Sequence, residues 1–314
     1  MHDQLNKKIL LAVDNSRPSR AALAYAISMA SIIPNLSYVL LHIEPMVSLF
    51  LKEEARTKAA ARKELEKIAK RNAQFANDLL DEYRQEMLAN GISADRIETH
   101  TQPRDLGVAK DIIDKAQQHQ YDAIVVGRRG LSGIAKLYAG SVTTDILEQS
   151  QLIPVWLVDG KVPPGDILLA VDGSEASLRM VDHVSFMLAG NSDTSITLLH
   201  VTNNAQNYCE IDLTEMDEPD FEEIVVRGDK ACIDDFYPLA MQKFKDAGIE
   251  ENCVSYESVS GQRRIGRAIV EFANKGKFST LVVGRRGLDK SFFMGSVSRH
   301  LINKVDEGAL WVVP

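Results

Sequence analysis

Short apolar runs alternate with longer helical stretches along the first half of the chain. Residues 8–13, 37–43, 96–101, 122–126 and 153–158 are rich in β-branched and other apolar residues, which is typical of strands covered on both faces. The clearest helix spans residues 60–90, where apolar positions recur every three, four or seven residues and Gly91 supplies the stop. This alternation predicts an α/β domain with a five-stranded parallel sheet and helices on both faces.

The second half repeats this pattern in the same order. Residues 9–14 (ILLAVD) return at 167–172, 40–43 (LLHI) return at 198–201 as LLHV, and 125–131 (VVGRRGL) return at 282–288. The run VWLV at 155–158 is matched by LWVV at 310–313. These collinear matches predict two tandem doubly wound domains, 1–159 and 160–314, joined by a stiff linker at 159–165. In the second copy, Pro238 predicts that the corresponding helix begins or kinks there.

Composition and charge narrow the protein class. Three cysteines without C-x-x-C spacing predict neither a disulfide framework nor a zinc site, which fits a protein of the reducing cytoplasm. The absence of a long apolar run predicts a soluble protein that does not enter a membrane. The net charge of −8 lies entirely in residues 161–314, where eight acids and no base fall between Glu210 and Glu223. We interpret that block as a solvated loop rather than a calcium site. Without a basic face, nucleic acid is not expected as a partner.

A glycine series follows the fourth predicted strand. Gly127, Gly130, Gly140 and Ser141 precede what looks like the start of the last helix. Glycines let the backbone approach an anion, and a helix N-terminus presents unpaired N–H groups, so this segment predicts a phosphate site. The hydroxyls of Ser141 and Thr143 could add hydrogen bonds.

Asp14 ends the first strand at the same edge of the sheet. Its carboxylate could reach a ribose hydroxyl or a phosphate-bound metal. Alternatively, Asp14 and Asp172, like Ser16 and Ser174, could cap the helices that follow.

Two other groups of polar residues could take part in phosphate binding or catalysis. Residues 128–129 and 285–286 are pairs of arginines that could make the electrostatic potential near bound phosphates more positive. Long side chains in an exposed loop are usually solvated, however, and we favour that interpretation. His42 and His200 end the second strand of each copy. Neither has a Ser or Cys nucleophile at a recognisable elbow nearby, so we interpret both as structural histidines.

At these residues the chain resembles the universal stress protein family, in its tandem two-domain type. The resemblance covers nearly the whole chain, and it implies an adenine nucleotide alpha hydrolase-like fold that binds ATP or a related adenine nucleotide, with Mg²⁺ as an optional companion. In the first copy it implies nucleotide contacts from Ala12, Asp14, Ile43, Val126, Gly127, Gly130, Gly140, Ser141 and Val142. In the second copy the matching residues are Ala170, Asp172, Val201, Val283, Gly284, Gly287, Gly295, Ser296 and Val297.

The second copy departs from the pattern. Seven residues separate Gly287 from Gly295, whereas nine separate Gly130 from Gly140. The missing residues must shorten the loop or the helix turn over the phosphates. We therefore expect the first site to bind the nucleotide more tightly.

These features favour a stress-response or regulatory module without catalytic activity. The alternatives are a scaffold of the same fold that acts without nucleotide through protein contacts, and a slow nucleotide hydrolase. The chain has no G-x-x-x-x-G-K-[ST] loop, and no G-x-G-x-x-G follows the first strand. Neither a P-loop enzyme nor a dehydrogenase is therefore expected.

The last strands suggest how the copies assemble. In the resembling family such strands lie at a sheet edge, where an apolar strand left open invites association. We expect the two last strands to meet antiparallel in an intrachain pseudo-dimer, with Trp156 and Trp311 near the contact. The 60–90 helix could in addition support a homodimer of whole chains.

Overall fold

The chain forms two compact units. One comprises Met1–Ile27 and Asn35–Val155, and the other comprises Ser28–Pro34 and Trp156–Pro314. The computed structural model describes residues 6–128, 142–163, 165–191, 193–203, 218–262, 264–276, 278–285, 294–304 and 307–314.

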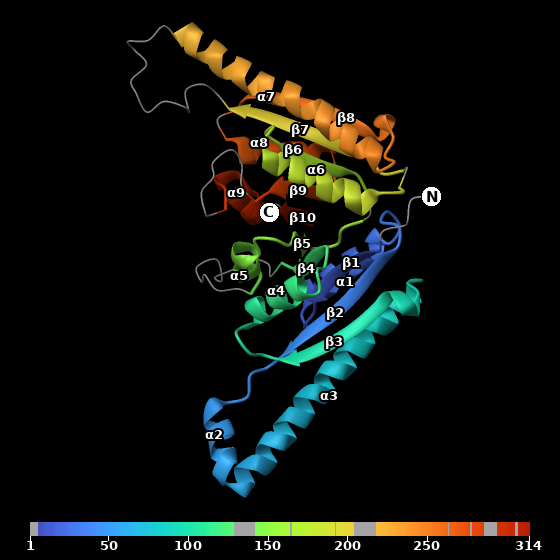
Figure 1. Ribbon diagram of the computed structural model, residues 1–314, viewed down its shortest axis with the longest axis vertical. Coiled ribbons are helices and arrows are strands. Elements are labelled where there is room, and N and C mark those ends of the chain that lie inside the picture. The colour runs from blue at the N-terminus through green and yellow to red at the C-terminus, as the bar shows by residue number, and fades with distance from the viewer. Residues whose placement is uncertain are drawn as a thin grey trace. The chain divides into compact units, whose positions relative to one another are not determined.

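The first unit contains a parallel sheet in the order β3-β2-β1-β4 (Figure 1). Its strands are β1 (Lys7–Ala12), β2 (Leu36–Glu44), β3 (Ile97–Pro103) and β4 (Ala123–Gly127). The helices of this copy are α1 (Arg17–Met29), α2 (Leu49–Thr57), α3 (Ala59–Ala89), α4 (Val108–Gln118) and α5 (Val142–Gln149). The predicted strands agree with these to within a few residues.

The second unit repeats this arrangement with two further strands, because the strand predicted at 153–158 as the fifth of the first copy lies in it from Trp156 onward. Its order is β5-β10-β9-β6-β7-β8, and the pairs β6–β7, β6–β9, β7–β8 and β9–β10 are parallel. The strands are β5 (Val155–Asp159), β6 (Ile167–Val171), β7 (Ile196–Asn203), β8 (Val254–Gln262), β9 (Thr280–Gly284) and β10 (Gly308–Val313). The helices are α6 (Glu175–Leu188), α7 (Glu218–Asp246), α8 (Ile265–Gly276) and α9 (Ser296–Lys304).

The strand order creates a switch point in each copy. The chain runs outward from β1 through β2 to β3 and then returns to the other side of β1 as β4. Right-handed crossovers place the helices of the two directions on opposite faces, and a crevice opens where the carboxyl ends of β1 and β4 diverge. The same crevice forms between β6 and β9.

Helix α3 matches the helix predicted over residues 60–90. It ends at Ala89 with Asn90 as its C-cap, and Gly91 follows with φ +85°, a left-handed conformation that glycine adopts without strain. Leu79, Tyr83 and Met87 are buried, as expected for an apolar stripe against a sheet.

Of the two alternatives predicted for Pro238, a helix start or a kink, helix α7 excludes the start. The helix runs continuously from Glu218 to Asp246 with Pro238 inside it. Pro238 is exposed, so water can satisfy the carbonyl that loses its N–H partner, while buried Phe236, Ala240 and Phe244 lie on one face of the helix on both sides of the proline.

A tryptophan cluster lies in the second unit, where β5 neighbours β10. The rings of Trp156 and Trp311 stack with centroids 4.0 Å apart and planes 2° apart. The Nε1–H group of Trp156 donates a hydrogen bond to Nε2 of His183 over 3.1 Å, and the His183 ring meets both indoles edge-on. The predicted proximity of the two tryptophans is present, and the two-fold pairing of the copies stays a prediction.

Stability is expected to depend on pH through His183. Burial lowers the pKa of this imidazole from 6.5 to about 3. The folded protein therefore holds His183 neutral while the unfolded chain takes up a proton, so stability falls as the pH drops below 6.5, by at most ~1.4 kcal/mol per pH unit.

Urea unfolding at pH 7.5 and pH 5 of the wild type and of His183→Gln tests this dependence. The variant keeps a hydrogen-bond acceptor but cannot be protonated, so it should lose about 2 kcal/mol less than the wild type between these pH values. The matched control is His119→Gln at an exposed position, which should behave like the wild type. Equal losses in the wild type and His183→Gln would contradict the prediction.

Candidate functional site

A cavity opens at the switch point of the first copy. Its floor comes from the ends of β1, β2 and β4, one wall from the first turn of α1, and the opposite wall from α4 and α5. The lining residues are Ala12, Val13, Asp14, Ser16, Pro18, Ser19, Leu41, His42, Ile43, Val108, Ile112, Val126, Gly127, Val142, Thr143 and Ile146. The cavity is polar where β1 meets α1 and apolar along α4 and α5.

The loop after β1 is held by its own side chains. The Ser16 N–H donates to Asp14 Oδ1 over 3.1 Å, and the Ser16 hydroxyl donates to the same oxygen. Ser16 Oγ in turn accepts the Ser19 N–H over 3.3 Å, while Ser19 Oγ accepts the Asp14 N–H over 3.0 Å. Ser16 therefore caps α1, and Asp14 orders the turn before it.

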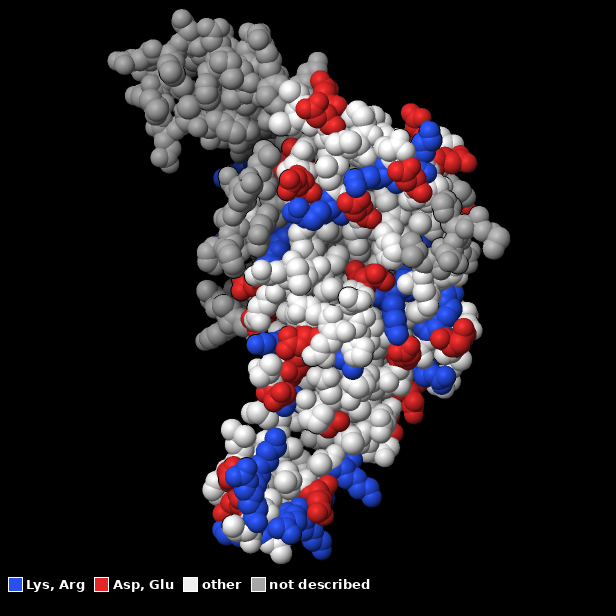
Figure 2. Space-filling model, viewed as in Figure 1, with Lys and Arg blue, Asp and Glu red and all other residues white. Residues whose placement is uncertain are grey.

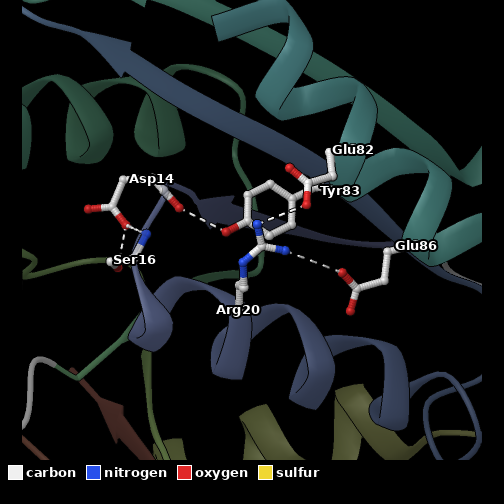
Figure 3. Close-up of polar contacts among 6 residues, drawn as sticks. All are labelled: Asp14, Ser16, Arg20, Glu82, Tyr83 and Glu86. Carbon is white, nitrogen blue, oxygen red and sulfur yellow. Dashed lines mark hydrogen bonds and ion pairs between the residues drawn. The ribbon is translucent and has the colours of Figure 1, made fainter. Parts of the chain in front are cut away.

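Helix α3 contacts this loop through the side chain of Tyr83. The buried Tyr83 hydroxyl donates to the Asp14 carbonyl over 2.8 Å (Figure 3). Burial raises the pKa of Tyr83, which keeps its hydroxyl protonated as a donor. Arg20 lies 5.4 Å from the centre of the Tyr83 ring and pairs with Glu82 over 2.8 Å and with Glu86 over 4.0 Å. The position of Asp14 thus depends on packing between α1 and α3.

Gly127 sits at the closest approach between β4 and α1. A Cβ atom at this position would lie 2.1 Å from the Pro18 carbonyl oxygen and 2.2 Å from its carbonyl carbon. Only glycine lets α1 pack this close to the strand end. This contact sets the distance between the two sides of the crevice.

The second copy builds the same kind of cavity from equivalent residues. It is lined by Ala170, Val171, Asp172, Ala176, Ser177, Met180, Leu199, Val201, Ile265, Ile269, Val283, Gly284, Gly295, Ser296, Val297 and Ser298. The Asp172 loop repeats the three N–H hydrogen bonds of the Asp14 loop, with Ser174 as the cap of α6. The hydroxyl that donates to the aspartate differs: it is Ser177, over 2.7 Å to Asp172 Oδ1, whereas in the first copy it is Ser16.

The support of that loop differs between the copies. Gly173 has φ +76°, and a Cβ atom there would lie 3.0 Å from the Cys232 carbonyl oxygen of α7. In the first copy the residue at this position is Asn15, and a tyrosine side chain carries the contact.

A hydroxyl in the last helix closes each cavity. Thr143 donates to the Gly127 carbonyl over 3.2 Å, and Ser298 donates to the Gly284 carbonyl over 2.6 Å. In the second copy the Gly295 N–H also donates to the Arg285 carbonyl over 3.0 Å. The Thr143 hydroxyl thereby connects α5 to the end of β4, and its predicted hydrogen bond to a phosphate stays a prediction.

Most predicted contact residues line the two cavities. In the first copy these are Ala12, Asp14, Ile43, Val126, Gly127 and Val142, and in the second they are Ala170, Asp172, Val201, Val283, Gly284, Gly295, Ser296 and Val297. The predictions for Gly130, Gly140, Ser141 and Gly287 lie outside the described residues.

The interpretation of the arginines as solvated is wrong for the two that the structure describes. Arg128 is 6% exposed and Arg285 is 3% exposed. Each follows its strand directly, and the Arg285 N–H bonds the Val313 carbonyl over 2.6 Å, which keeps this residue in the sheet layer rather than in a loop. The interpretation of His42 as a structural histidine holds for one ring nitrogen: His42 is buried, and its Nδ1 donates to the Val13 carbonyl over 2.9 Å. Its Nε2 is buried without a hydrogen-bond partner among the described residues.

Sequence reasoning missed the apolar wall. Val108 and Ile112 of α4 correspond to Ile265 and Ile269 of α8, and both pairs are spaced i, i+4 on one helix face. Each pair lies 157 residues from its counterpart, so the repeat in the sequence could have revealed this wall.

Within the described ranges, no cluster of three or more His, Cys, Asp or Glu side chains is placed to hold a metal ion. None of the described helices is long and apolar enough to cross a membrane.

Solved structures share this architecture. A universal stress protein from Archaeoglobus fulgidus DSM 4304 has a TM-score of 0.65 at 20% identity, with 98% of each chain covered. A putative universal stress protein from Pseudomonas aeruginosa UCBPP-PA14 has a TM-score of 0.58 at 17% identity, and the alignment covers 99% of this chain and 94% of the Pseudomonas chain. A universal stress protein in complex with cAMP is 22% identical, with a TM-score of 0.30, and the alignment covers 48% of this chain and 96% of the chain of that protein. No curated protein sequence matches the chain.

Two tandem doubly wound copies, each with a cavity at its switch point, define a protein of the adenine nucleotide alpha hydrolase-like fold. The universal stress protein family model matches residues 5–159 and again residues 165–313. The chain therefore belongs to the universal stress protein family, as a tandem member.

Proposed function

We propose that each copy binds ATP or a related adenine nucleotide, and that the protein acts as a stress-response or regulatory module rather than as an enzyme. The observation that carries the proposal is the repetition of one cavity. Both switch points combine an Asp-Ser-Ser loop on one side with an aliphatic wall on the other. This combination suits a ligand with a flat apolar ring and a polar, charged tail.

The lining suggests how such a ligand would lie in the first copy. Val108, Ile112 and Ile146 offer a surface for a purine face, and the strand end at Ile43 offers backbone groups to its edge. Asp14 lies at the polar end, within reach of a ribose hydroxyl or of a phosphate-bound Mg²⁺. Phosphates would follow at the N-terminus of α5, which favours negative charge.

Two alternatives compete with this function. A scaffold that acts without nucleotide would keep the cavities only as packing features, and a slow hydrolase would release ADP or AMP. Nucleotide occupancy that shifts a conformation or an association is the regulatory step we favour, because the Asp14 loop is coupled through Tyr83 to the long helix α3.

Calorimetry of the full chain with ATP tests the proposal. Wild type should bind at two sites, Gly140→Val and Gly295→Val should each lose one site, and the double variant should lose both, because a β-branched side chain fills the phosphate approach. Circular dichroism and thermal unfolding of the variants serve as the fold control. Unchanged binding in the double variant would show that these glycines only form turns.

The two sites are expected to differ in affinity. The sequence between Gly287 and Gly295 is two residues shorter than the sequence between Gly130 and Gly140. Titration of Gly295→Val and Gly140→Val with ATP measures the first and second sites separately. The first should bind more tightly, and equal dissociation constants would contradict this expectation.

A further inference from the structure

A helical arm of the first copy extends beyond the sheet. Helix α2 packs on α3 through buried Ala55, whose carbonyl accepts a hydrogen bond from Arg62 Nε over 3.3 Å. Residues 59–75 of α3 include no buried side chain, and the buried positions of the helix begin at Ala76. We call residues 46–75 the basic arm.

Positive charge gathers on the basic arm, which corrects the expectation that the chain has no basic face. The arm holds eight Lys and Arg residues against four acids, in a chain whose net charge is −8. Lys63, Lys67 and Lys70 are exposed and spaced four and three residues apart, so they line one face of α3. Figure 2 shows the blue side chains of the arm gathered at the lower end of the view.

Apolar side chains accompany these charges. Met46 is 50% exposed, Leu49 is 66% exposed and Phe50 is 71% exposed, all in or just before α2. Three large apolar side chains within five residues are more than the scattered exposure of a solvated surface. The basic arm therefore combines exposed apolar side chains at the start of α2 with a positive face on α3, which is the composition of a contact surface.

The second copy carries the complement of this surface. The basic arm follows β2, and residues 210–223 follow the equivalent strand β7. Segment 210–223, of which the structure describes residues 218–223 only as part of α7, has eight acids, no base, and interleaved apolar residues at Ile211, Leu213, Met216 and Phe221. The same place in the repeat is therefore basic and apolar in one copy, and acidic and apolar in the other.

We propose that the basic arm of one chain binds the acidic segment 210–223 of a second copy of the chain. Opposite charge and apolar content match between the arm and the sequence of the segment, which favours encounter and orientation. Each chain carries one arm and one segment, so exchange between two chains makes two equivalent contacts and closes the assembly.

Charge reversal with mixing tests this association. Sedimentation at low salt should show a wild-type dimer that weakens as salt screens the charges. The arm variant Lys63→Glu, Lys67→Glu, Lys70→Glu changes the charge of the arm from +4 to −2. The segment variant Asp212→Lys, Glu215→Lys, Asp217→Lys, Asp220→Lys, Glu222→Lys changes the charge of the segment from −8 to +2. Each variant should weaken self-association by about tenfold or more. A one-to-one mixture of these variants should regain the wild-type dimer, because each arm then meets a segment of opposite charge.

The matched control reverses three exposed lysines outside the arm, Lys161, Lys245 and Lys275, and should dimerise like the wild type. A wild type that stays monomeric at its highest soluble concentration would overturn the proposal. So would a mixture that stays dissociated, since contacts within one chain cannot be restored by mixing, or a control variant that weakens as much as the arm variant.

Discussion

Replacing Gly127 with alanine should destabilise the first unit by about 3 kcal/mol or more and remove nucleotide binding from its site. The added Cβ atom would overlap the Pro18 backbone, which cannot rotate away as a side chain could. Helix α1 would have to shift, and with it the Ser16 cap and the Asp14 loop. Denaturant unfolding and ATP calorimetry of the full chain measure both effects.

The matched control for this substitution is Gly165→Ala. Its added Cβ atom would lie 3.4 Å from the Ser279 Cβ, an ordinary contact distance, so stability and both nucleotide sites should stay close to wild type. Wild-type stability and wild-type ATP affinity in Gly127→Ala would show that α1 and β4 are not packed as closely as described.

Replacing Trp311 with alanine should cost about 3–5 kcal/mol of unfolding free energy. The side chain is fully buried and stacks on Trp156, so its loss leaves a large cavity beside β10. Trp311→Phe keeps an aromatic ring and should cost only about 1–2 kcal/mol. Denaturant unfolding followed by circular dichroism gives the free energies.

An exposed leucine provides the baseline for this series. Leu239→Ala removes a side chain that is mostly in solvent, so its cost should stay within about 0.5 kcal/mol. The chain has two tryptophans, so fluorescence of Trp156 in Trp311→Ala reports directly on the loss of the stack. A cost below 1 kcal/mol in Trp311→Ala would mean that the stack is not a packed core element.

The strands and the repeat could be predicted because buried parallel strands are apolar along their whole length. Segment 122–126 became β4 within one residue, and the helix predicted at 60–90 runs from Ala59 to Ala89. Local chemistry was sufficient in both cases, since an apolar stripe and a following Gly91 specify a helix without knowledge of its neighbours.

Features that depend on packing could not be predicted in this way. A proline normally signals a helix start, but Pro238 is tolerated because buried residues hold both halves of α7. The pattern did not show that Arg128 is buried, because arginines next to glycines usually lie in exposed loops. Asp14 and Ser16 were both candidate caps, and their roles were separated by the hydrogen bonds of the loop.

Native mass spectrometry of the full chain with ATP tests the central claim most directly. The account predicts that the protein binds two adenine nucleotides per chain, with the first copy filled at lower concentration than the second. Binding of one nucleotide would restrict the function to one copy. A chain that takes up neither ATP nor ADP, AMP or cAMP at saturating concentration would contradict the account and leave a scaffold that acts through protein contacts.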